Sequence, residues 1–248
     1  MVPAPWSIDE IADHAAAGIA DANQALRDEN AVRGLDHLDE IDLHTVLEAG
    51  FVSADLGLAR EHPFPTPAKR KPKASERERC DLVLLPGPDA VLIDPVEADA
   101  EAEALAQTLF ATAAADALAP GSGSKIASPG VRPDDAFWIE VKSTGQFVAR
   151  DDVPQPNSRY TTELIRHPAQ DIRKLVREPM ASQAAAAVLL FAADEATARH
   201  DLSAAVHAWL DSDLPIRSPA IRVAPIDDRI GNTVCAVCLV PIRKHAGS

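Results

Sequence analysis

Hydrophobic and polar positions alternate along the chain between helical and strand-like patterns. Apolar residues recur at helical spacing over 8–32 and 36–49, and Gly50 follows at the position expected for a C-terminal cap. We expect further helices at 95–119, 162–177 and 195–210. Short apolar runs bounded by proline and glycine predict strands at 51–64, 79–86, 136–142, 184–192, 220–226 and 233–241.

This order of elements predicts an α/β layered fold with a mixed central sheet. The length of 248 residues suits a single domain, 1–248. We place its core at about 36–192, preceded by an N-terminal helix within 1–35 and followed by a C-terminal helix and strands within 193–248. An acidic, helical insertion at about 87–134 interrupts the core.

The charge is strongly acidic overall and unevenly distributed. Lys and Arg number 24 and Asp and Glu 38, a formal net charge of −14. Proteins that coat nucleic acid indiscriminately are basic, so the balance argues against that class. Residues 86–119 hold seven acids and no Lys or Arg, whereas residues 69–79 hold six bases and two acids. The basic strip could contact phosphate, and the acidic insertion could serve a homodimer or a protein partner.

Targeting and redox signals are weak. The first residues, "MVPAPWSIDEIADH", lack the basic and apolar regions of a signal peptide, and the longest apolar run, 184–193, is too short to cross a bilayer. We therefore expect a cytoplasmic protein without a membrane partner. Cys235 and Cys238 form a C-x-x-C motif without further zinc ligands at matching spacing, so we interpret both as structural.

The stretch "FWIEVKSTGQF" carries the candidate chemistry. Side chains alternate along a strand, so Glu140 and Lys142 share one face, and their burial is costly unless each is paired or coordinates a ligand. An exposed ion pair on an edge strand is the simplest interpretation. Asp81, however, begins an earlier short strand, and two carboxylates with the carbonyl of Val141 form an oxygen-rich half-shell for Mg²⁺. A lysine there can position or deprotonate a water and offset charge on a phosphate.

The order Asp81, then Glu140-x-Lys142, resembles the PD-(D/E)XK nuclease superfamily, and "SERERCDLVL" resembles an uncharacterised bacterial branch of it. The resemblance covers about 36–192. It implies a restriction-endonuclease-like αβββαβ core and cleavage of nucleic acid, DNA first, with Mg²⁺, for which Mn²⁺ substitutes. Asp81, Glu140 and Lys142 would be the metal and catalytic residues. Glu40, in "EIDLHTVLEAGF", would be a further metal ligand or an acid behind the ligands.

Several residues are candidates for contact with nucleic acid or metal. On the helix after the E-x-K strand, "AQDIRKL" offers Gln170, Asp171 and Lys174, of which we favour Gln170 or Lys174 near a phosphate. The further predicted phosphate contacts are Arg173 and, in the basic strip, Lys69, Arg70, Lys71 and Lys73. Glu61 is either a further acid near the metal or a strand-end charge. For His44, a helix-capping or surface role is favoured over a place in the cleft.

Two other functional classes stay open at this level. A nuclease-like fold that has lost activity and become a binding or regulatory module would account for the acidic charge. A structural subunit whose E-x-K pair is a surface ion pair is the third option, and there loss of Lys142 would change little, about 0–1 kcal/mol.

Overall fold

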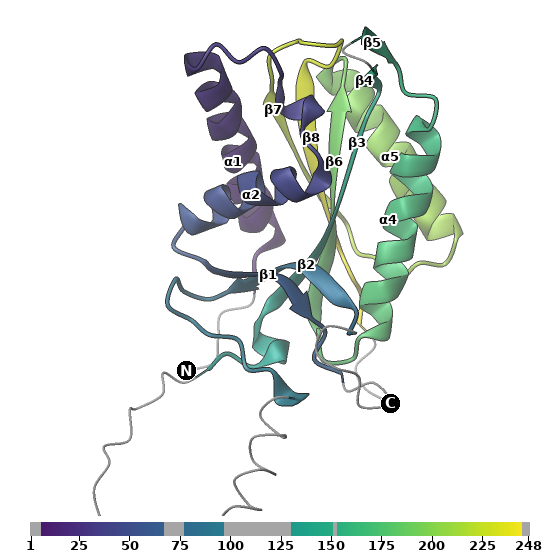
Figure 1. Cartoon of the computed structure of the whole chain (residues 1–248). Coiled ribbons are helices and arrows are strands. Elements are labelled where there is room, and N and C mark those ends of the chain that lie inside the picture. Colours follow the sequence, from purple (N-terminus) through teal and green to yellow (C-terminus); the bar gives the residue numbers. More distant parts are fainter. Residues whose placement is uncertain (1–5, 67–76, 97–129, 151–152, 245–248) are drawn as a thin grey trace, which may run out of the picture.

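The computed structural model describes residues 6–66, 77–96, 130–150 and 153–244 (Figure 1). The helices are α1 (Ile8–Asp28), α2 (Glu40–Val52), α4 (Tyr160–Arg177) and α5 (Glu195–Asp211). The strands are β1 (Gly57–Pro63), β2 (Arg79–Leu85), β3 (Phe137–Gly145), β4 (Phe147–Arg150), β5 (Val153–Pro156), β6 (Gln183–Ala192), β7 (Ala220–Pro225) and β8 (Val234–Pro241). Short 3₁₀ turns occupy Leu35–His37 and Pro133–Asp135.

The main sheet is mixed and mostly antiparallel. Its strand order is β1-β2-β3-β6-β8-β7. Only β3 and β6 run parallel, and the long connection between them contains α4, as a parallel crossover requires. The other neighbours pair antiparallel. The protein is therefore a mixed α/β fold, as the hydrophobic pattern predicts.

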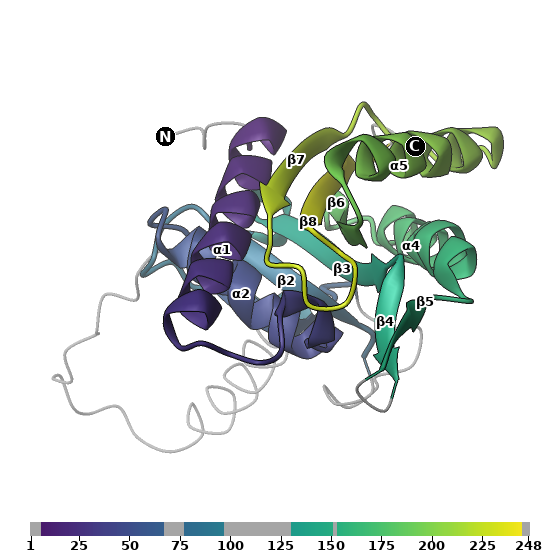
Figure 2. The ribbon, with the colours of Figure 1, turned by 90° about the horizontal axis from the view of Figure 1, so that it is seen from above.

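Helices cover both faces of this sheet, α1 and α2 on one side and α4 and α5 on the other (Figures 1 and 2). Two hydrophobic clusters match these layers. Ile19, Leu47 and Phe51 join the first, and Ile172 and Trp209 join the second. Strand β6, "QAAAAVLLFA", is buried along nearly its whole length because both of its faces are covered.

The helix starts follow sequence signals. The Ser7 side chain accepts a hydrogen bond from the backbone N–H of Glu10, and Asp39 does the same for Asp42 at the start of α2. The expected C-terminal cap at Gly50 is wrong, because α2 continues through it to Val52. Gly50 instead lies against α1: a Cβ added there would lie 2.3 Å from the carbonyl oxygen of His14. The glycine permits two helix backbones to cross closely.

Other boundaries differ from expectation. The predicted strand 51–64 begins only at Gly57, since Phe51 and Val52 complete α2. Between β3 and α4, where the sequence pattern predicts no strand, β4 and β5 pair antiparallel. The expected helix at 95–119 lies almost wholly outside the described residues. No helix in the described part of the chain is long and apolar enough to cross a membrane.

Candidate metal and catalytic centre

The candidate site lies where β2 and β3 separate. Their ladder consists of three residue pairs and ends at Leu82 and Ile139. Asp81 and Glu140 would form the next pair in the same register, but there the strands part. The Asp81 carboxylate enters the gap, where its Oδ2 accepts a hydrogen bond of 2.7 Å from the backbone N–H of Val141. Strand divergence thus brings Asp81 to the start of the Glu140-x-Lys142 motif.

Glu140 is a buried carboxylate that faces α4. It is only 2% exposed, and its Oε1 lies 2.9 Å from Nζ of Lys174. Burial, with the neighbouring charge of Asp81, outweighs Lys174 and raises the pKa of Glu140 to about 8. A divalent cation would offset the same negative charge that now favours the proton.

Lys142 points toward α2 and α4 and not toward bulk water. Its Nζ donates to Glu40 Oε1 at 2.6 Å and to the Val141 carbonyl at 3.1 Å, and it lies 3.8 Å from Oδ2 of Asp171. Burial alone would lower the pKa of Lys142, but the hydrogen bond with Glu40 and the surrounding carboxylates raise it. Lys142 is therefore a cation at neutral pH, held between two helices.

Helix α4 contributes Asp171 and Lys174, which are three residues apart and therefore share a face. Burial, with the charges of Asp81 and Glu40, raises the pKa of Asp171 to about 6 in spite of Lys142 and Lys174. Lys174, which we predicted near a phosphate, instead contacts Glu140, the backbone carbonyl of Arg79 and the ring of Phe64. Asp171 faces Lys142, a role the sequence interpretation did not assign.

Two of the other predicted nucleic-acid contacts, Gln170 and Arg173, lie in the described part of the chain. Gln170 and Arg173 are exposed on α4, and an Arg173 guanidinium nitrogen donates to the Ala169 carbonyl of its own helix. The basic-strip residues Lys69, Arg70, Lys71 and Lys73 lie outside the described residues. Their role stays a prediction.

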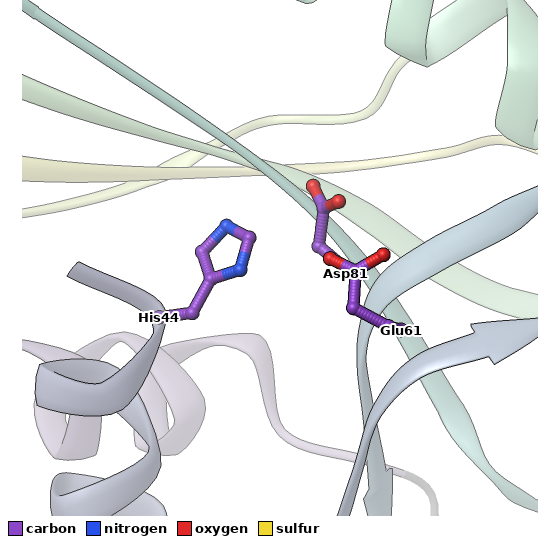
Figure 3. A group of neighbouring side chains, drawn as sticks. All are labelled: His44, Glu61 and Asp81. Atoms are coloured by element: carbon purple, nitrogen blue, oxygen red, sulfur yellow. The ribbon is translucent and has the colours of Figure 1, made fainter. Parts of the chain in front are cut away.

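A histidine and a third acid lie beside Asp81. Glu61 stands directly opposite Asp81 in the β1–β2 register, although these two residues do not pair, and its backbone φ is +48°. One ligand atom each of His44, Glu61 and Asp81 can be chosen so that all lie within 4.8 Å of one another. Figure 3 shows the His44 ring facing the two carboxylates. Glu61 is therefore a further acid at the site, one of the two roles left open for it.

The expectation of a surface or capping role for His44 is wrong. His44 is a residue of α2, one turn after Glu40, and only 2% of its surface is exposed. Neither ring nitrogen has a hydrogen-bond partner within the described part of the chain. A buried polar group without a partner costs about 1–3 kcal/mol, so the position calls for a ligand.

The cluster as a whole has an excess of negative charge. Among the described residues, five carboxylates from five elements lie next to two ammonium groups, those of Lys142 and Lys174. The acids are Glu40, Glu61, Asp81, Glu140 and Asp171. Neighbouring carboxylates repel one another, and their oxygen atoms are the ligands that a hard divalent cation such as Mg²⁺ prefers. The donor set therefore fits the metal that the sequence resemblance implies.

The two cysteines of the C-x-x-C motif lie on β8, away from the residues of the site. Cys235 and Cys238 are both buried on β8 but belong to the two different hydrophobic clusters, on opposite faces of the sheet. Burial raises the pKa of both thiols. Their structural interpretation agrees with this placement, since one ion cannot bind both thiols across the strand.

Comparison with known protein-family models, with curated proteins and with solved structures finds no match to the chain.

Proposed function

We propose that this protein is a metal-dependent nuclease of the PD-(D/E)XK type, with a restriction-endonuclease-like fold, that hydrolyses phosphodiester bonds of nucleic acid, in the first instance DNA. The order α2-β1-β2-β3-α4-β6, with the small strand pair β4–β5 inserted before α4, supports the fold, because without that insertion it has the αβββαβ sequence that the resemblance implies. The observation that carries the function is the hydrogen bond from Val141 N–H to Asp81, 2.7 Å long, which holds the Asp81 carboxylate at the backbone between Glu140 and Lys142.

The residues would divide the chemistry among them. Asp81, Glu140 and the Val141 carbonyl would hold Mg²⁺ or Mn²⁺, with Glu40 behind them. When bound, such an ion polarises a phosphate oxygen and lowers the pKa of a water. Lys142, charged and oriented by Glu40, offers positive charge to a phosphate oxygen as negative charge builds up during attack. A raised pKa makes this electrostatic role a better fit for Lys142 than removal of a proton from water.

Lys174 has a different role in this scheme. Its ammonium group contacts the Glu140 carboxylate from the side of α4. It lies where a metal cation would bind. Binding of Mg²⁺ would release Lys174 from Glu140 and leave it free to meet a substrate phosphate. This is how the predicted phosphate contact of Lys174 is compatible with the ion pair seen in the structure.

The test is cleavage of supercoiled, linear and single-stranded DNA with Mg²⁺ or Mn²⁺ added after chelation. We compare wild type with Asp81→Asn and Lys142→Met, and we use Arg199→Met as the control, since Arg199 forms an exposed pair with Glu195 on α5. Loss of a metal ligand or of the lysine should lower the rate by about 100-fold or more. Cleavage that both substitutions leave unchanged would refute the assignment.

A second candidate is a binding or regulatory module without catalysis. It is favoured by the contacts already present, because Glu140 and Glu40 each have a lysine ammonium group within 2.9 Å without a metal. Calorimetry separates the two proposals. Absence of Mg²⁺ and Mn²⁺ binding, together with absence of cleavage, would favour the module.

A further inference from the structure

The imidazole of His44 is the feature that the proposed oxygen-ligand site does not use. It is buried, it has no hydrogen-bond partner among the described residues, and it faces the carboxylates of Glu61 and Asp81 (Figure 3). A solvated acid pair at a strand end would need no such partner. A buried imidazole aimed at two acids is a second and independent sign of a ligand.

The fold supplies these three groups from three separate elements, α2, β1 and β2. His44 is held by its helix, whose neighbouring Leu43 and Leu47 are buried in the core, and Asp81 by its hydrogen bond from Val141. Glu61 is exposed and can rotate. The candidate ligand atoms lie within 4.8 Å of one another. Ligand atoms of a tetrahedral zinc ion, each about 2.0–2.1 Å from it, are roughly 3.4 Å apart, so a rotation of Glu61 toward His44 and Asp81 would close the site.

The chemical type of the ligands selects the ion. Magnesium and calcium ions prefer oxygen ligands alone, whereas imidazole favours zinc and its neighbours in the first transition row. Zinc sites that keep a position open have three protein ligands, and both imidazole nitrogen and carboxylate oxygen are among the atoms that bind zinc. Glu140 does not belong to this group of three and faces Lys174.

We propose that His44, Glu61 and Asp81 form a binding site for a first-row transition-metal ion of the zinc type. The site is distinct from the oxygen-ligand set at Glu140 and Val141, although the two share Asp81. The inference goes beyond the proposed nuclease function and does not depend on it, since the site would bind its ion even in a chain that cleaves nothing.

The experiment is titration of the chelator-treated full chain with Co²⁺, followed by visible absorption, with Zn²⁺ and Mg²⁺ as competitors. Wild type should bind Co²⁺ with the spectrum of a nitrogen-ligated ion, Zn²⁺ should displace it, and a large excess of Mg²⁺ should not. His44→Gln and Glu61→Gln should each weaken Co²⁺ binding by roughly 100-fold or more, since loss of a group merely behind a ligand already costs 10–100-fold.

Two controls separate this site from its neighbours. Glu48→Gln removes an acid from the same helix, one turn after His44, and should leave Co²⁺ binding unchanged, because Glu48 contacts Arg60 instead. Glu140→Gln should also retain the Co²⁺ site while it removes the proposed Mg²⁺ ligand. If His44→Gln fails to fold, Glu61→Gln decides the question, because Glu61 is exposed.

Equal Co²⁺ affinity in wild type and Glu61→Gln would overturn the proposal, and so would displacement of Co²⁺ by Mg²⁺ or loss of the site in Glu140→Gln alone. Failure of the nuclease proposal gives a different result: no cleavage of DNA with any ion, whatever the Co²⁺ titration shows.

Discussion

Removal of the Lys174 ammonium group should destabilise the protein in a way that depends on pH. Lys174 Nζ lies 2.9 Å from a carboxylate that is 2% exposed. At that distance, with an effective dielectric constant of about 20, the attraction is about 6 kcal/mol, and the dehydration of both groups cancels part of it. Lys174→Met keeps the aliphatic length of the side chain and removes only the charge.

The pH dependence follows from the pKa of Glu140, which is raised from 4.5 to about 8. Below pH 8 the folded protein holds the Glu140 proton, so the ion pair contributes little and the variant should lose only about 1 kcal/mol. Above pH 8 wild type releases the proton beside Lys174. The variant, whose Glu140 pKa is higher still, must keep it. The stability that the variant loses relative to wild type then grows by about 1.4 kcal/mol per pH unit. This loss is about 2 kcal/mol larger at pH 9.5 than at pH 6.

Urea unfolding of wild type and Lys174→Met at pH 6 and pH 9.5, after removal of metal, measures this difference. An extra loss of about 2 kcal/mol corresponds to a further fall in the melting temperature of roughly 4–8 °C for a chain of this size. Arg199→Met is the control, because its exposed pair should contribute about 0.3–0.5 kcal/mol at both pH values. An equal loss at both pH values for Lys174→Met would show that Glu140 does not titrate as the structure implies.

Two further predictions concern the same site and the helix crossing beside it. Glu140→Gln removes the carboxylate whose raised pKa makes wild type lose stability as pH rises from 4.5 to about 8. The unfolding free energy of this variant, measured relative to that of wild type, should therefore rise by about 1.4 kcal/mol per pH unit between pH 5 and pH 8. Parallel curves of unfolding free energy against pH would contradict this. Gly50→Ala places a methyl group 2.3 Å from the carbonyl oxygen of His14, so its urea-unfolding free energy should fall by about 1–3 kcal/mol although alanine is the better helix former. Gly87→Ala is the control, since a Cβ there has no neighbour within 4 Å and should change stability by less than about 0.5 kcal/mol; equal stability of the two variants would refute the close helix crossing.

Part of the site lies on elements that the sequence predicts closely. Strands β2 and β6 and helix α4 start and end within two residues of their predicted bounds, whereas α2 and β1, which carry Glu40, His44 and Glu61, differ more from theirs. Their apolar runs are short, strongly patterned and bounded by proline, glycine or charge. The acid in β2 and the E-x-K motif in β3 are visible because a charge within an apolar strand is costly without a partner.

The remaining features depend on contacts between distant segments. Glu61 meets Asp81 only because β1 and β2 pair in one particular register, and nothing local in "REHPFP" indicates that pairing. His44 is buried because its turn of α2 packs into the interior. The sequence shows only a histidine between helix-forming residues. The sequence predicts a helix end at Gly50. The residue that explains this glycine, Gly18, belongs to another helix and is distant in the sequence. The pairing of Lys174 with Glu140 likewise requires the position of α4 over β3.

Two ammonium groups are the cationic partners of this site among the described residues. Lys142 lies against Glu40 and Lys174 against Glu140, and these contacts hold the helices against the diverging strands. In the proposed nuclease, an ion at Glu140 would have to compete with Lys174, so metal binding would exchange one cation for another.

Crystals soaked in Mn²⁺, with anomalous diffraction recorded at the manganese edge, test the central claim most directly. The account predicts an anomalous peak about 2 Å from carboxylate oxygens of both Asp81 and Glu140, with the Lys174 ammonium group moved away from Glu140. A map without manganese at Glu140, in which Lys174 keeps its 2.9 Å contact, would contradict it.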